Sequence, residues 1–317
     1  MGTVYDIAII GAGPAGIAAA VESVIGGMEN VILFEKGDNH SMTIRKYYKD
    51  NKRVDKDWKG QKVDLDGNID FTDGTKESTL DLFDKMLDDH KVNALFNTEI
   101  DSVVKESHFL IKTTDGALYE ARNVVVAIGS MGKPNKPSYK IPPSVKQRVN
   151  FNLDSCSKDE EVLVVGGGNT AAEYAYYLAD TNNVTLNYRR GSFSRLNPEN
   201  EKIVYECVET KRMFLKLGVD ITDIEGERGK IKVNYSDGMV FFYDRIIYAL
   251  GGVMPTDMLK KCGIEIDEKG RPVCDSDFQT PVPGLYVAGD VAIEIGGSIA
   301  AGLNHAFKIV NHIKNRL

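Results

Sequence analysis

The first 35 residues constrain the fold more than any other part of the chain. An apolar run at 4–10 is typical of a buried parallel strand, a second run at 31–34 is typical of its neighbour, and an alanine-rich helix fits between them to about Ser23. The turn into this helix reads GAGPAG at 11–16, which is a G-x-G-x-x-G pattern. The segment is therefore expected to be a βαβ unit in an α/β fold with a parallel sheet.

Each glycine of this turn has a physical role in binding a dinucleotide. Gly11 allows the tight turn, Gly13 has no side chain to block a pyrophosphate, and Gly16 lets the helix lie close to the strand. The N–H groups at the helix N-terminus attract phosphate. Glu35, which ends the second strand, can accept a hydrogen bond from a ribose hydroxyl. The unit therefore predicts a dinucleotide site.

Length and composition set the class of protein. A chain of 317 residues suits two domains, and a net charge of −7 argues against a general nucleic-acid binder. No apolar run approaches the ~18 residues that span a bilayer, and the first strand starts too early for a signal peptide to precede it. The histidines are scattered, so no metal site is predicted. The widely spaced cysteines indicate free thiols in a reducing cytoplasm; they are Cys156, Cys207, Cys262 and Cys274.

The opening pattern occurs again further along the chain. An apolar strand at 161–165 leads into GGGNTA at 166–171, and a helix and a strand at 184–188 follow. After each such unit the sequence predicts a hairpin, which ends with a strand at 117–121 and at 240–243. A separate apolar strand that runs into glycine follows each hairpin, at 123–129 and again at 245–251. The chain is therefore expected to contain two copies of one dinucleotide-binding plan.

The order of these motifs predicts an insertion. Beyond Gly251 the chain starts no third domain but gives T-x-x-P-G-L-Y-V-A-G-D at 280–290 and a final helix near 298–316. The expected fold is α/β, with two Rossmann-like, three-layer ββα domains, the second inserted into the first. The first domain is predicted to span 1–130 and 251–317, and the second 131–250, beginning with a linker at 131–150.

Together these motifs resemble the small thioredoxin-reductase-like flavoproteins, over nearly the whole chain and in the same order. The residues that carry the resemblance are GAGPAG with Glu35, VVAIG at 125–129, GGGNTA and the 280–290 motif. The resemblance implies FAD on the first domain and NADPH on the inserted one. It also implies a homodimer, and two domains that rotate to bring nicotinamide to flavin.

The resemblance assigns individual residues to the FAD site. It places Glu35 at the adenosine ribose, Asp290 at the ribityl or pyrophosphate region, and the start of the last helix at the flavin O2, where a helix dipole favours negative charge. The full set expected at FAD is Gly11, Gly13, Pro14, Ala15, Gly16, Glu35, Lys36, Ala127, Gly129, Gly289, Asp290, Gly297 and Ser298. Two histidines, His40 and His305, are named as further candidate neighbours of the flavin.

The inserted domain carries a signal for NADPH. Its second strand ends in Tyr188, Arg189 and Arg190, where an NAD site has an acid; arginines bind a 2′-phosphate that an acid would repel. The family has a similar arginine pair, usually after histidine. The set expected at NADPH is Gly166, Gly168, Asn169, Thr170, Arg189, Arg190 and Arg195.

One family feature is missing. Thioredoxin reductases carry C-x-x-C before the second glycine motif, but that spacing lands here on Val149 and Asn152. Cys156 is alone and could form only mixed disulfides, and Ala15 stands where bacillithiol-disulfide-reductase-like relatives have cysteine. Electrons are therefore expected to leave the flavin directly, as in the thioredoxin-reductase-like ferredoxin– or flavodoxin–NADP reductases. No catalytic side chain is predicted.

The acceptor is open on sequence alone. The segment 45–62 holds eight Lys or Arg against three Asp, with Tyr47, Tyr48 and Trp58, and is a candidate docking surface for an acidic carrier. An aromatic residue of this segment could cover the flavin. Many related reductases use a C-terminal extension for that purpose, whereas this sequence stops at Leu317, directly after the last predicted helix. Three alternatives stand: a quinone reductase or oxidase, an atypical disulfide reductase, and a non-enzymatic flavin- or NADPH-sensing module.

Overall fold

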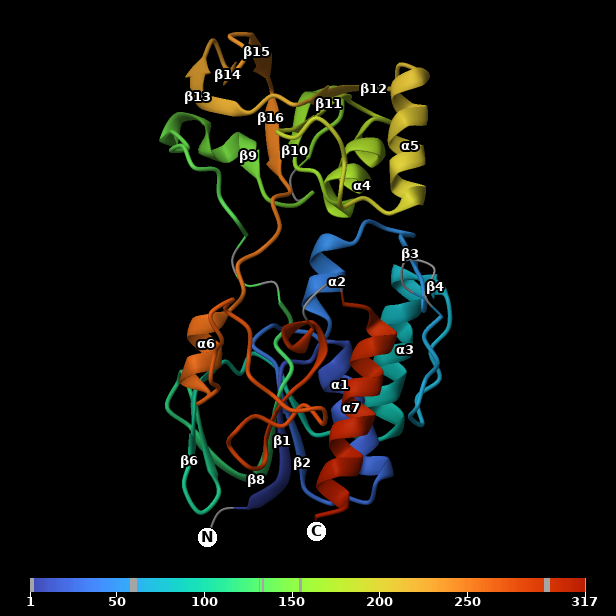
Figure 1. The fold of residues 1–317 in the computed structure, drawn as a ribbon, viewed down its shortest axis with the longest axis vertical. Helices are drawn as coiled ribbons and strands as arrows, with labels where there is room; N and C mark the ends of the chain where they lie inside the picture. The colour runs from blue at the N-terminus through green and yellow to red at the C-terminus, as the bar shows by residue number, and fades with distance from the viewer. Residues whose placement is uncertain are drawn as a thin grey trace. The chain divides into compact units, whose positions relative to one another are not determined.

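The computed structural model describes residues 3–57, 62–130, 132, 134–153, 156–293 and 297–316. The chain forms two compact units, a first unit of Met1–Gly132 with Met254–Leu317 and a second unit of Lys133–Val253 (Figure 1). Each unit contains a parallel sheet of its own. Within the described ranges, no helix is both long enough and apolar enough to cross a bilayer.

The first unit is built on a seven-stranded sheet in the order β5-β2-β1-β8-β7-β6, with β17 paired to β8. The strands β5, β2, β1, β8 and β17 are parallel, and β6, β7 and β8 form an antiparallel layer. Their bounds are β1 Val4–Ile10, β2 Val31–Phe34, β5 Ala94–Leu95, β6 Ile100–Lys105, β7 Phe109–Thr113, β8 Leu118–Val126 and β17 Leu285–Val287.

One prediction for this sheet was wrong. The sequence predicts separate strands at 117–121 and 123–128, but β8 runs through both. The chain stays extended at Arg122 and Asn123 because β1 pairs along almost the whole of β8. The first half of β8 pairs with β7 and its end pairs with β17, so this one strand joins the two layers.

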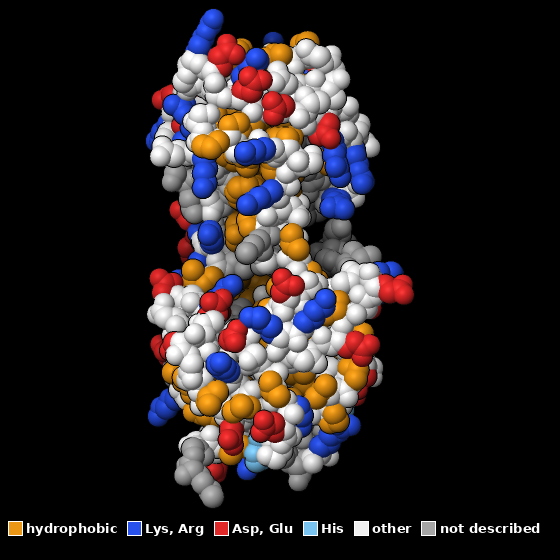
Figure 2. Space-filling view, turned by 90° about the vertical axis from the view of Figure 1, so that its left-hand side faces the viewer, with side chains coloured by type: hydrophobic (Ala, Val, Ile, Leu, Met, Phe, Trp, Pro, Cys, Tyr) orange, Lys and Arg blue, Asp and Glu red, His pale blue; other side chains and the backbone are white. Residues whose placement is uncertain are grey.

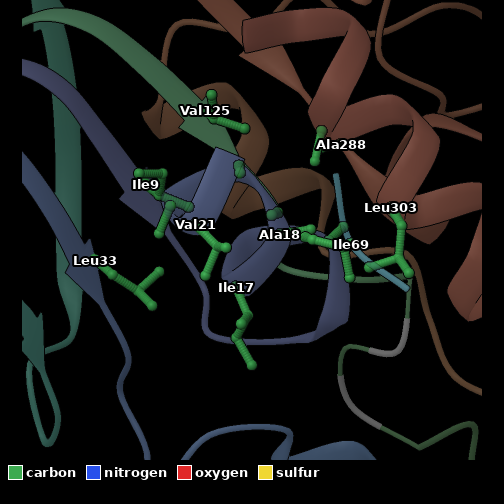
Figure 3. Packing of buried hydrophobic residues seen from close by; sticks show 14 of the residues in the cluster. Ile9, Ile17, Ala18, Val21, Leu33, Ile69, Val125, Ala288 and Leu303 are labelled. Atoms are coloured by element: carbon green, nitrogen blue, oxygen red, sulfur yellow. The ribbon is translucent and has the colours of Figure 1, made fainter. Parts of the chain in front are cut away.

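Three long helices cover one face of the parallel sheet, and shorter elements complete the unit (Figure 1). The bounds are α1 Pro14–Ile25, α2 Met42–Tyr47, β3 Arg53–Val54, β4 Gly74–Thr75, α3 Lys76–Asp89, α6 Thr256–Lys261, η2 Gly289–Ala292 and α7 Ile299–Lys314. The helices α1, α3 and α7 share a core with Ile9, Leu33 and Val125 (Figure 3). The alternate residues Ala8 and Ile10 are buried on the opposite face, so β1 reads as a continuous apolar run.

The second unit repeats this plan with a five-stranded parallel sheet, β12-β11-β10-β16-β9, and a three-stranded antiparallel sheet, β13-β14-β15. The bounds are η1 Pro143–Arg148, β9 Val149–Asn150, β10 Glu161–Val165, α4 Asn169–Leu178, β11 Asn183–Tyr188, α5 Pro198–Glu209, β12 Met213–Leu217, β13 Ile221–Glu227, β14 Lys230–Tyr235, β15 Val240–Tyr243 and β16 Arg245–Tyr248.

The predicted linker is partly ordered structure. Val145 of η1 is buried, and the hydroxyls of Tyr139 and Tyr248 lie 2.7 Å apart, so the segment packs on the core of the second unit. Its strand β9 pairs with β16. The segment therefore forms one edge of the sheet of the second unit, which the sequence interpretation as a linker missed.

Candidate dinucleotide sites

The first glycine turn has the geometry that its sequence predicts. Gly11 has φ +103°, and a Cβ there would lie 2.6 Å from the carbonyl oxygen of Ala127. A Cβ on Gly16 would collide with the carbonyl oxygen of Gly11. Only glycine fits at these two positions, because α1 and β8 both approach the turn closely.

At Gly13, unlike at these two glycines, the space that a side chain would occupy is open. A Cβ there would meet no atom within 4 Å, and Gly13 is the N-cap of α1 without a side-chain cap. The first N–H groups of α1 therefore have no side-chain acceptor at the cap and are available to an anion.

This turn lines a cavity of about 390 Å³ in the first unit. The cavity lies beyond the carboxyl ends of β1, β2 and β8, where ligands bind in open α/β sheets. It brings together twelve of the thirteen residues predicted at FAD: Gly11, Gly13, Pro14, Ala15, Glu35, Lys36, Ala127, Gly129, Gly289, Asp290, Gly297 and Ser298. The exception is Gly16, which is buried beneath the turn.

Glu35 is held in place by backbone donors. Its Oε2 accepts from the N–H of Ala12 at 2.9 Å, and its Oε1 accepts from the N–H of Gly37 at 2.8 Å. Each carboxylate oxygen has a second acceptor position, so a ribose hydroxyl can still donate to Glu35. The two backbone bonds orient the carboxylate before any ligand arrives.

Asp290 opens into the same cavity. Its carboxylate has no hydrogen-bond partner within the described ranges, and loss of solvent around it raises its pKa. A Cβ on Gly297 would collide with this carboxylate, so the Ser298 end of α7 can approach it only through glycine. The open turn, the ordered Glu35 and the unpaired Asp290 fit a flavin dinucleotide, which offers a pyrophosphate and several hydroxyls.

Two histidines named as possible flavin neighbours do not line the cavity. The N–H of Gly289 donates to Nδ1 of His305 at 3.3 Å, and the His305 ring stacks on Phe278 at 3.9 Å between centroids. Burial lowers the pKa of His305 to about 4. His40 is fully buried, and its Nε2 lies 2.9 Å from Oδ1 of Asp84. His305 is therefore neutral, and it accepts a hydrogen bond from Gly289, which lines the cavity.

Several lining residues were missed by sequence reasoning. They follow β2 and β5 or lie on α6: Ser41, Met42, Thr43, Ile44, Thr98, Glu99 and Met258. Thr98 and Glu99 come shortly after β5, so the rule that sites form at carboxyl ends of parallel strands could have identified them. Met42 carries no comparable sequence signal, whereas Tyr48 belongs to segment 45–62, from which an aromatic residue was expected at the flavin.

The docking segment 45–62 is less positive than its sequence suggests. Arg45 lies 3.4 Å from Asp84, Lys62 pairs with Asp64 at 3.4 Å, and Arg53 pairs with Asp55 and Asp73. The Lys52 ammonium lies 4.0 Å from the centroid of the Tyr48 ring. Tyr48 reaches the cavity, whereas Trp58 lies outside the described residues. Neighbouring carboxylates thus neutralise part of the segment.

In the second unit the loop that follows β11 is fastened to the glycine turn. Gly168 and Arg195 form a β-bridge, and the N–H of Asn197 donates to Oδ1 of Asn169 at 2.8 Å. The structure therefore brings Gly168, Asn169 and Arg195 together. Arg189, Arg190 and Thr170 are exposed, and Gly166 is buried. A Cβ on Gly168 would meet nothing within 4 Å, as at Gly13 of the first turn.

The cysteines are all free thiols. Cys207 and Cys262 are buried, and burial raises the pKa of Cys262 to about 12. Of the two positions of the missing C-x-x-C, Val149 is half-buried in β9 and Asn152 is buried.

Comparisons with known proteins agree with this architecture. Residues 8–289 match the family described as pyridine nucleotide-disulphide oxidoreductase. A thioredoxin reductase of Helicobacter pylori is 27% identical and covers 98% of this chain and 99% of its own. A ferredoxin–NADP reductase of Lactobacillus delbrueckii is 27% identical and covers 89% of this chain and 86% of its own.

Solved structures share the fold. The bacillithiol disulfide reductase of Bacillus cereus has a TM-score of 0.82 at 23% identity, covering 99% of this chain and all of that chain. A thioredoxin reductase of T. acidophilum has a TM-score of 0.80 at 22% identity, covering 98% of each chain. The predicted thioredoxin-reductase-like fold, with two Rossmann-like domains, is confirmed. The predicted cofactors are also confirmed for the family, which uses FAD and NADPH. The chain belongs to the pyridine nucleotide-disulphide oxidoreductase family.

Proposed function

We propose that this chain is an NADPH-dependent FAD oxidoreductase that passes electrons to an external one-electron carrier, ferredoxin or flavodoxin, without a dithiol relay. The first unit binds FAD through the residues that line its cavity, and the second unit binds NADPH through its glycine turn and arginines. A homodimer and a cytoplasmic location belong to the same proposal, supported by the family resemblance and the free thiols.

The distribution of the cysteines carries this proposal. A disulfide reductase needs two thiols that can form an internal disulfide and pass two electrons onward. Here no two cysteines are spaced as C-x-x-C, and Cys207 and Cys262 are buried. Relatives named ferredoxin–NADP reductase, at 23–27% identity, support the choice of carrier.

The residues act by binding and orientation. When bound, FAD supplies the hydride acceptor and the outlet for electrons. The Gly13 turn and the N-terminus of α1 hold the pyrophosphate, Glu35 orients the adenosine ribose, and Asp290 fixes the chain that carries the ring. Tyr48, which lines the cavity, covers the ring.

The carrier is proposed to dock near segment 45–62. Acidic and basic side chains alternate over both units on the face in Figure 2, so no single-sign field covers that face. Docking therefore depends on local positive charge. Lys49 directly follows Tyr48, and the Lys52 ammonium lies 4.0 Å from the centroid of the Tyr48 ring, so these two lysines are the candidates.

Acceptor profiling tests the proposal. The NADPH-reduced holoenzyme is mixed in a stopped-flow instrument with flavodoxin, ferredoxin, a quinone, oxygen and a disulfide. We expect the acidic one-electron carriers to be fastest, with no change in a Cys156→Ser variant. A disulfide that reacts fastest would contradict the proposal and favour an atypical disulfide reductase. Fastest turnover with quinone or oxygen would favour the quinone reductase or oxidase, and no turnover despite bound FAD would favour a sensing module.

A further inference from the structure

We infer that the stacked rings of Tyr188 and Phe193 position the arginines of the second unit, and that this stack sets the preference for a 2′-phosphorylated ribose. The inference rests on the proposed binding of NADPH to this unit. It assigns a positioning role to two aromatic residues that touch neither phosphate nor ribose in the account above.

Tyr188 lies at the end of β11, against the glycine turn. A Cβ on Gly167 would collide with the Tyr188 ring, so the ring lies flat on the turn and requires glycine at its middle position. The ring is half-buried, and the turn beneath it precedes α4, whose N-terminus is the phosphate-binding end. Tyr188 therefore links the phosphate turn to any residue that stacks on its ring.

Phe193 stacks on the Tyr188 ring. Its ring is parallel to the Tyr188 ring within 3°, with centroids 5.8 Å apart, and Tyr205 of α5 meets it edge-on at 6.4 Å. Offset stacks and edge contacts of this kind are the favoured aromatic geometries. Phe193 also packs against the core of the second unit, so the middle of the loop after β11 is anchored to the domain.

Hydrogen bonds hold the two ends of the same loop. The N–H of Gly218 donates to the carbonyl oxygens of Tyr188 and Arg190, at 3.0 and 2.9 Å. At the other end, Arg195 bridges to Gly168 and Asn197 donates to Asn169. Phe193 lies between these fastened ends, in the stretch that separates Arg190 from Arg195.

The arginines themselves are held only through this backbone. Arg189, Arg190 and Arg195 are exposed and have no ion-pair partner in the part of the chain that the structure describes. If the loop is no longer held in place, the arginine side chains become ordered only when the phosphate binds. The conformational entropy that they then lose weakens phosphate binding. The rest of the nucleotide contacts the glycine turn and is not affected in the same way. The stack should therefore act on the 2′-phosphate selectively.

The test measures binding of adenosine 2′,5′-bisphosphate and of 5′-AMP to the FAD-loaded protein by calorimetry. In Phe193→Ala we expect the 2′,5′-bisphosphate to bind about tenfold more weakly, with 5′-AMP changed by no more than about twofold. Tyr188→Phe keeps the stack, so the ratio of the two affinities, for the 2′,5′-bisphosphate and for 5′-AMP, should stay at its wild-type value. Phe214→Ala removes an aromatic ring that is 67% exposed on β12 of the same unit, and should also keep it.

A cycle with the triple variant Arg189→Ala, Arg190→Ala, Arg195→Ala completes the test. Adding Phe193→Ala to it should cause no further loss of bisphosphate binding, because the groups that the stack positions are gone. The inference is overturned if Phe193→Ala weakens the binding of both ligands equally. It is also overturned if Tyr188→Phe loses the preference for the bisphosphate over 5′-AMP. If the arginine variant loses the preference and Phe193→Ala keeps it, the inference fails and NADPH binding stands. If the wild-type protein shows no preference, both fail.

Discussion

Gly13→Ala separates the fold of the first glycine turn from its binding function. A Cβ on Gly13 would meet no atom within 4 Å, and the residue has φ −79°, which alanine adopts freely. The added methyl would project into open space where the pyrophosphate is proposed to lie. The substitution should therefore leave the polypeptide folded and obstruct FAD.

The structure sets the size of both effects. Alanine is a poorer N-cap than glycine, so we expect a stability loss of about 1 kcal/mol or less. A pyrophosphate pushed away from the N-terminus of α1 loses at least one hydrogen bond to a charged group, which contributes about 2 kcal/mol. The Kd for FAD should therefore rise about thirtyfold.

The assay is titration of apoprotein with FAD, followed by quenching of flavin fluorescence, with thermal unfolding of the same samples. The matched control is Gly168→Ala, the corresponding position of the second turn, where a Cβ also meets nothing within 4 Å. It should bind FAD normally and NADPH poorly. Wild-type FAD affinity in Gly13→Ala would refute the placement of the pyrophosphate on this turn.

The remaining predictions concern pH, stability and docking. The pKa of His305 is lowered to about 4, so the unfolded chain binds this proton more readily, and stability is lost as pH falls from about 6.5 towards 4. In urea titrations between pH 7 and 5, His305→Asn should lose about 1–2 kcal/mol less stability than the wild-type protein; equal losses would contradict this. The Arg245 guanidinium is buried and donates to both oxygens of Glu160, at 2.7 and 2.9 Å. Glu160→Ala leaves this charge without its partner and should lower the free energy of unfolding by about 3 kcal/mol. A change under about 1 kcal/mol would show that the pair is solvated. Reversing Lys49 and Lys52 to Glu should slow reduction of an acidic carrier about tenfold at low salt and spare a small neutral quinone; an equal effect on both acceptors would exclude docking there.

The elements next to the two glycine turns could be predicted from sequence because both faces of their strands are buried. The runs at 4–10, 31–34 and 161–165 are strands with those bounds, because the consecutive buried residues in each run are apolar. By contrast, β8 was divided at Arg122 because polar residues there suggest a break. Its pairing with β1 on one side overrides that local signal.

The residues of the candidate site also divide into those that the sequence could predict and those that it could not. Residues of the glycine motifs gather around one cavity because they directly follow parallel strands, and that placement is readable from order alone. Met42 reaches the cavity only because α2 packs beside it, which depends on contacts between distant segments. The neutralisation of Arg53 by Asp73 likewise requires the pairing of β3 with β4. Such contacts leave no periodic pattern in the sequence.

The most direct test of an electron path without thiols is an anaerobic titration of the FAD-loaded protein with NADPH. The visible absorbance of the flavin reports its reduction, and a thiol reagent reports new thiols after acid quenching. The account predicts full reduction by about one NADPH per flavin, with no gain in thiols, because the protein has no second two-electron centre. Consumption of about two NADPH per flavin, with the appearance of new cysteine thiols, would contradict it.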